Sequence, residues 1–147
     1  MQRSLLALPG LLSAVCLATC LALLKQAEAT MEGLREEYHG QVGECLERRQ
    51  RAAEKDPDSL DGATSLELAL HLTLGGRVDR AVRYVAPGLR HATALYKTEE
   101  GALVASRFLE LAGPAVPLET RVEVMLALAG FHEHEGRRVE ERAVLRL

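Results

Sequence analysis

LELALHLTLGGRVDRA, residues 66–81, is the stretch that decides the fold. Leucine occupies every second position of its first nine residues, which is the alternation of a half-buried strand. The residues between are helix formers with almost no β-branching, residues 59–74 together exceed a typical strand, and Gly75 and Gly76 supply a helix stop. We therefore expect a helix over residues 59–74. Neighbours should cover it on more than one side, because alternate leucines cannot share one helical face.

The sequence after this helix has helical periodicity, interrupted at Pro87-Gly88, at residues 113–117 and at Gly136. The expected helices are residues 78–86, residues 89–97 as a kinked continuation or a separate helix, and residues 98–112, 118–133 and 137–147. The expected apolar face of residues 118–133 consists of Val122, Met125, Leu126 and Ala129. Leu, Ala and Val dominate the apolar 48% of the chain, with no Trp, which also favours helices. Short connections make antiparallel neighbours, so an all-α domain is expected over residues 58–147.

Residues 30–57 precede this domain and also have a helical pattern. Met31, Leu34 and Tyr38 fall at three- and four-residue spacing with charged residues between them. We expect an amphipathic helix that either continues as a stalk or packs on the helical domain after it. The helix should run from Thr30 to Lys55 and stop before Asp56, because a residue before proline is disfavoured in helical geometry.

Residues 4–24 form an apolar run of 21 residues without a charge. As a helix the run would span roughly 30 Å, the thickness of the hydrocarbon core of a bilayer. It is therefore expected to be a single-pass membrane anchor, with the polar domain outside the cytoplasm. The alternative is a signal peptide comprising residues 1–29, cut after Ala29, which leaves a secreted or periplasmic product. Small residues recur every four positions and would allow two such helices to self-associate; they are Gly10, Ala14, Ala18 and Ala22.

Two of the three cysteines, Cys16 and Cys20, lie in the apolar run, and Cys45 stands alone outside it. The polar part of the chain therefore cannot form an internal disulfide. The net charge of −3 and the lack of aromatic residues among basic ones argue against nucleic-acid binding.

Part of the decisive stretch resembles a tetratricopeptide repeat. The resemblance is carried by Ala69 and Leu72, by the glycine-basic turn at Gly76, and by Ala81 with Val85 after it. Gly88 stands where the family usually has alanine. A second, degenerate copy is carried by Met125, Leu128, Ala129 and Gly136-Arg137. The resemblance covers residues 60–147 and implies helical hairpins that bind a protein. An ordinary small helical bundle is the alternative.

No catalytic constellation is evident, and we expect neither an enzyme nor a cofactor. His132-Glu133-His134-Glu135 resembles a metal cluster, but histidines two positions apart on a helix point to different faces, whereas the helical zinc motif separates them by four. We therefore expect no metal site. No glycine-rich phosphate loop occurs either.

The expected partner-binding residues are the basic ones that come after Gly76: Arg77, Arg80, Arg83 and Arg90. They could contact an acidic partner or anionic lipid. The alternatives are a solvated face or pairing with the glutamate-rich C-terminal third. The sequence thus indicates a non-enzymatic, membrane-tethered or exported adaptor or assembly protein. A small accessory subunit that packs on a larger membrane complex is the alternative.

Overall fold

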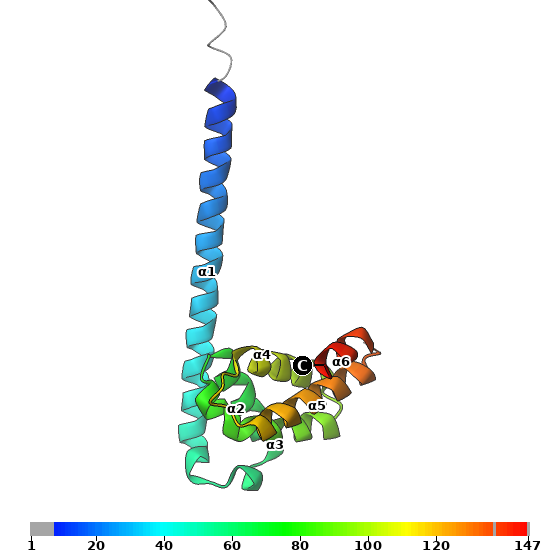
Figure 1. The fold of residues 1–147 in the computed structure, drawn as a ribbon. Helices are drawn as coiled ribbons and strands as arrows, with labels where there is room; N and C mark the ends of the chain where they lie inside the picture. The colour runs from blue at the N-terminus through cyan, green and yellow to red at the C-terminus, as the bar shows by residue number, and fades with distance from the viewer. Residues whose placement is uncertain (1–7, 137, 147) are drawn as a thin grey trace, which may run out of the picture. The chain divides into compact units, whose positions relative to one another are not determined.

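The computed structural model describes the backbone of residues 8–136 and 138–146, and the side chains of residues 19–136 and 139–146 (Figure 1). The chain divides into two compact units, Met1–Arg35 and Glu36–Leu147. Its helices are α1 (Leu8–Gln50), η1 (Ala52–Glu54), η2 (Pro57–Ser59), α2 (Gly62–Leu74), α3 (Val78–Ala94), α4 (Thr98–Leu111), α5 (Leu118–His134) and α6 (Arg138–Val144). All regular structure in the described residues is helical, which confirms the expected all-α class.

Several of the expectations fall on residues that are not described. Residues 4–7 of the apolar run and Arg137, which was part of the second repeat copy, lie outside the described residues. The exposure of Gly10, Ala14 and Ala18 is likewise outside the described part of the chain. In the part of the chain that is described, no helix is both long and apolar enough to cross a bilayer. The anchor and the self-association stripe therefore stay predictions.

α1 ends earlier than the sequence predicts, at Gln50 rather than at Lys55. Arg51 adopts the left-handed conformation, with φ of 50°, and this turns the chain out of the helix. The turn places Ala52 in the core, where it is fully buried. Burial of Ala52, the first residue of the short η1 helix, therefore accompanies the loss of the last turn that was expected of α1.

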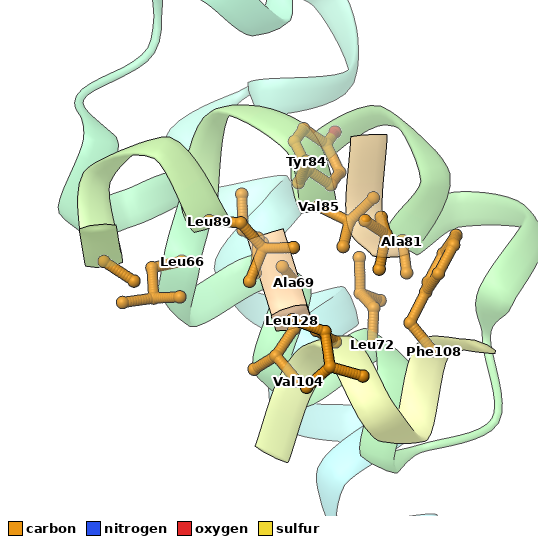
Figure 2. Close-up of a cluster of buried hydrophobic side chains, with 14 of the residues drawn as sticks. Leu66, Ala69, Leu72, Ala81, Tyr84, Val85, Leu89, Val104, Phe108 and Leu128 are labelled. Atoms are coloured by element: carbon orange, nitrogen blue, oxygen red, sulfur yellow. The ribbon is translucent and has the colours of Figure 1, made fainter. Parts of the chain in front are cut away.

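α2 confirms the expected helix and its coverage on several sides. The alternating Leu66, Leu68 and Leu72 are buried, and so are Ala69 and Thr73 on the intervening faces. Figure 2 shows Leu66, Ala69 and Leu72 within the buried cluster. α3 then runs through Pro87 instead of breaking there. A proline inside a helix costs about 3 kcal/mol. Apolar side chains of α3 are buried on both sides of the proline, and this burial offsets that cost.

The buried positions of α2 and α3 recur on α4 and α5. The buried positions are Leu68, Ala69 and Leu72 on α2, and Val104, Ala105 and Phe108 on α4. They are Ala81, Val85 and Gly88 on α3, and Val124, Leu128 and Phe131 on α5. The spacing of these buried positions is the same in each pair, and α2 packs against α3 as α4 does against α5. The sequence resemblance had instead aligned α5 with α2, through Met125, Leu128, Ala129 and the turn at Gly136, and that alignment stays a prediction.

The buried face of α5 agrees with the expected one only in part: Ala129 is buried and Met125 packs against the core, as expected. Val122 and Leu126 were expected to face the core, but they are 45% and 59% exposed. The core instead receives Val124, Leu128 and Phe131. Both faces are apolar, so the periodicity of α5 did not show which of them packs against α4.

Tight turns connect α2 to α3 and α5 to α6. Gly76 and Gly136 have φ of +68° and +72°, in the left-handed region that favours glycine. After α2, the N–H of Arg77 donates to the carbonyl of Leu72 at 2.8 Å, the long bond of a Schellman turn. The turn after α3 has the same type of bond, from the N–H of Lys97 to the carbonyl of Ala92 at 2.9 Å. Its left-handed residue is Tyr96 rather than a glycine.

Candidate interaction surfaces

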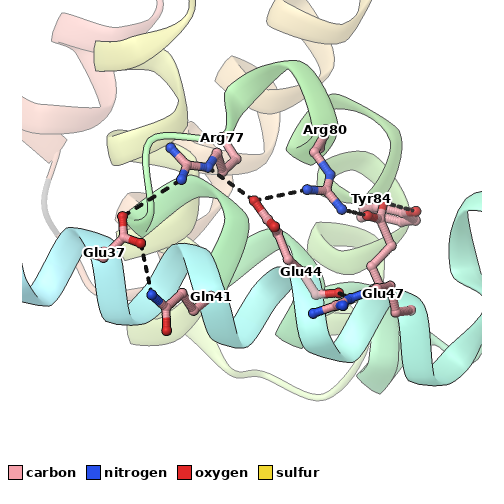
Figure 3. Close-up of polar contacts among 8 residues, drawn as sticks. Glu37, Gln41, Glu44, Glu47, Arg77, Arg80 and Tyr84 are labelled. Atoms are coloured by element: carbon pink, nitrogen blue, oxygen red, sulfur yellow. Dashed lines mark hydrogen bonds and ion pairs between the residues drawn. The ribbon is translucent and has the colours of Figure 1, made fainter.

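Two of the predicted partner-binding arginines contact glutamates of α1 rather than solvent alone. Arg77 forms ion pairs with Glu37 at 3.8 Å and with Glu44 at 3.3 Å. Arg80 pairs with Glu44 at 3.1 Å and with Glu47 (Figure 3). We call these five residues, together with Tyr84, the α1–α3 polar cluster. It connects the last turns of α1 to the start of α3.

Glu47 is the buried centre of this cluster, since it is only 5% exposed. The hydroxyl of Tyr84, which is fully buried, donates to its carboxylate at 2.7 Å. Burial is the main cause, and this bond to Glu47 the second, that raises the pKa of Tyr84 to about 12. The bond from Arg80 to Glu47 likewise raises the pKa of Arg80. The buried carboxylate thus accepts hydrogen bonds from Arg80 and Tyr84 and connects α1 to α3.

Close backbone approach accompanies the polar cluster. A methyl group on Gly75, at the end of α2, would lie 2.3 Å from the backbone nitrogen of Gly40 on α1. A methyl group on Gly43 would lie 2.8 Å from the side chain of Leu72. Real side-chain carbons do not come so close, so α1 can pack against α2 at this distance only because these positions are glycine. In the sequence, Gly40 and Gly43 lie within the periodic apolar pattern of residues 30–55 and were expected only to weaken that helix. Their role in packing was therefore not predicted.

The other two predicted arginines contact the segment after α1. Arg83 donates to the backbone carbonyls of Ala53 at 3.0 Å and of Lys55 at 3.2 Å. It therefore caps carbonyls that the early end of α1 leaves free. Arg90 pairs with Asp58 and, at 2.9 Å, with Glu123 of α5.

All four arginines are thus engaged within the chain, yet all keep some exposed surface. Their acidic partners lie mainly on α1, and only Glu123 belongs to the C-terminal third that the sequence suggested. Their role in binding a partner stays a prediction. Glutamates at positions 37, 44 and 47, on the same helix as the two packed glycines, were the signal that could have indicated the cluster.

A different surface carries unpartnered apolar side chains. On α5, Leu118, Val122 and Leu126 succeed one another at four-residue spacing and are 72%, 45% and 59% exposed. A separate shallow hollow of about 290 Å³ lies where α3 begins and α4 ends, and its apolar lining includes Val78, Val82, Leu111 and Val116. Exposed apolar side chains in a row are a common feature of surfaces that bind proteins.

The histidine-glutamate run at the end of α5 is divided between two environments. His132 is buried, whereas His134 is exposed and packs edge-on against the ring of Tyr96. Within the described residues, no three His, Cys, Asp or Glu side chains lie together as metal ligands would. Cys20 and Cys45 are free and exposed.

Comparisons with protein families, with curated proteins and with solved structures found no match.

Proposed function

We propose that this chain is a non-enzymatic adaptor or assembly protein built from tetratricopeptide-like hairpins. The observation that supports the proposal is the matching spacing of buried residues in α2–α3 and α4–α5, with a small buried residue, Ala69 or Ala105, in the first helix of each pair. Stacked hairpins of this kind form extended surfaces and bind proteins more often than they catalyse reactions. The exposed apolar side chains of α5 supply a contact surface that packing within the chain does not use.

The proposal includes a tether. Residues 4–24 have the length and composition of a single-pass membrane helix, with the polar domain outside the cytoplasm. Cleavage after Ala29 is the alternative and would give a secreted or periplasmic adaptor. In either case residues 30–147 would meet the partner outside the cytoplasm. The mass of the mature N-terminus distinguishes the two cases.

The contact surface can be tested by capture of a partner from the native membrane extract, with full-length protein as bait. Leu126→Ser should leave stability within about 0.5 kcal/mol, because the side chain is exposed. It should weaken capture about tenfold, which corresponds to a loss of about 1.4 kcal/mol. Leu103→Ser is the matched control, since Leu103 of α4 is 51% exposed and lies outside the α5 row. Equal capture by both variants would remove α5 from the contact.

Arg90→Glu tests the predicted role of the arginines in the same assay. Arg90 is half-exposed and pairs only with exposed or half-exposed carboxylates, so its charge reversal should cost little stability. Reduced capture that also becomes less sensitive to salt would support the arginine surface. The accessory-subunit alternative is tested with residues 30–147 alone. An adaptor should still capture its partner without the apolar run, whereas a packing subunit should not.

A further inference from the structure

His39 of α1 and His71 of α2 face each other outside the polar cluster. Their Nδ1 atoms are 2.9 Å apart, and their ring centroids are 5.0 Å apart with the planes tilted by 37°. Both side chains are half-buried. The pair therefore forms a hydrogen bond between two imidazoles across the contact of α1 with α2.

This bond depends on the protonation state of the two rings. One Nδ1 must carry a proton and donate it, and the other must offer a lone pair. If both rings are protonated, each Nδ1 carries a proton, so no acceptor remains and two like charges lie side by side. The contact is thus available when at least one ring is neutral and is lost when both are charged.

The surroundings leave the rings little room to separate. Just after His39 and His71, Gly40 and Gly75 hold the two backbones at the closest approach in this contact. The charged and titratable groups nearby are Glu36 and Tyr38 on α1, Glu67 on α2, and Arg77 just after α2. The pKa of His71 is lowered mainly by burial and secondly by the charge of His39. The negative charge of Glu67 opposes this effect only in part. The environment thus favours a neutral His71.

We propose that the His39–His71 pair is a pH-sensitive latch that holds the C-terminal part of α1 on α2 at neutral pH and releases it when both rings are protonated. The contacts of the polar cluster contain no histidine, the side chain that ordinarily titrates between pH 5 and 8. They remain formed while the latch opens, so release loosens α1 without unfolding the hairpins.

Hydrogen–deuterium exchange on the full chain in detergent micelles tests the latch. Exchange is measured at pH 7.5 and 5.5 and corrected for the intrinsic effect of pH on amide exchange. We expect the amides of residues 39–43, which precede the glutamates still held by the polar cluster, to exchange roughly two- to tenfold faster at pH 5.5, the range that repulsion between two partly screened unit charges produces. The amides of α4, which does not carry the pair, serve as the internal reference and should not change.

His71→Phe and His39→Phe should each abolish this pH response, because neither variant can place two charges at the contact. The two variants together keep the test decisive if one of them fails to fold. His134→Phe is the matched control, since His134 is exposed on α5, and it should keep the full response. A response that persists in both latch variants, or none in the unmodified chain, would overturn the proposal. So would protection of the same amides by Zn²⁺ at pH 7.5, which would make the pair a metal site instead.

Discussion

Replacement of Glu47 by alanine is the sharpest test of how α1 is attached to the hairpins. The change removes the carboxylate that accepts the hydrogen bond of the Tyr84 hydroxyl. Tyr84 is fully buried, so solvent does not replace that acceptor. A buried polar group left without a partner costs about 1–3 kcal/mol. Arg80 also loses a partner, but its side chain is 33% exposed and keeps Glu44, so its contribution is small after screening by solvent. We expect Glu47→Ala to lower the free energy of unfolding by about 2–3 kcal/mol.

Tyr84→Phe removes the same bond from the other side. Glu47 then keeps Arg80, and the expected cost is about 1–2 kcal/mol. The double variant should cost less than the sum of the single ones, with a coupling of about 1 kcal/mol, because both changes remove one shared bond.

The assay is urea unfolding of the full chain at pH 7.5, followed by far-UV circular dichroism. Glu54→Ala is the matched control, since Glu54 is an exposed residue just after α1 and its replacement should change stability by at most about 0.5 kcal/mol. If Glu47→Ala behaved like this control, the buried carboxylate would not be what holds α1 in place. Strict additivity in the double variant would show that Glu47 and Tyr84 do not interact.

Three further predictions concern the hairpins and their turns. Gly88→Ala should destabilise the chain by about 1–3 kcal/mol in the same unfolding assay, because its methyl group would lie 2.9 Å from the Cα of Leu66; Gly130→Ala, with open space around it, should not. Tyr96→Gly should raise the melting temperature, because Tyr96 has φ of 55° and relief of the left-handed conformation is worth about 1 kcal/mol; an unchanged or lower value would contradict this. Because the pKa of His71 is lowered on folding, the unfolded chain binds more protons, so the free energy of unfolding should fall as pH drops below about 6.5, and His71→Phe should flatten that slope.

Periodicity and chain breaks were enough to predict most helices. Gly75-Gly76 and residues 113–117 end helices where expected, and the alternating leucines of α2 form a helix. Pro87 misled the prediction because its local cost is outweighed by burial that only the folded neighbours reveal. On α5, two adjacent faces are both apolar, and the sequence contains no information on which of them meets α4.

The surroundings of the arginines could not be predicted for a related reason. A basic helix looks the same in sequence whether its partner is another protein or a distant segment of its own chain. Arg77 and Arg80 meet glutamates more than thirty positions away. The pairing depends on α1 lying against α2, and that approach depends on Gly43 of α1 and on Gly75 at the end of α2. Local helix propensity predicts that Gly43 destabilises α1, whereas in the folded chain it permits the contact.

The joint between α1 and the hairpins therefore differs in kind from the packing within the hairpins. α2–α5 are held by large buried apolar side chains such as Leu72, Phe108 and Phe131, and their stability depends mainly on apolar area removed from water. The buried residues on the inner face of α1 are instead Gly40, Gly43 and Glu47. Leu46 is its partly buried apolar contact with the core, and the other contacts of α1 are close backbone approach, ion pairs and a pair of histidines. Contacts of this type respond to pH and salt, whereas apolar packing responds far less, so the joint can loosen under conditions in which the hairpins remain folded.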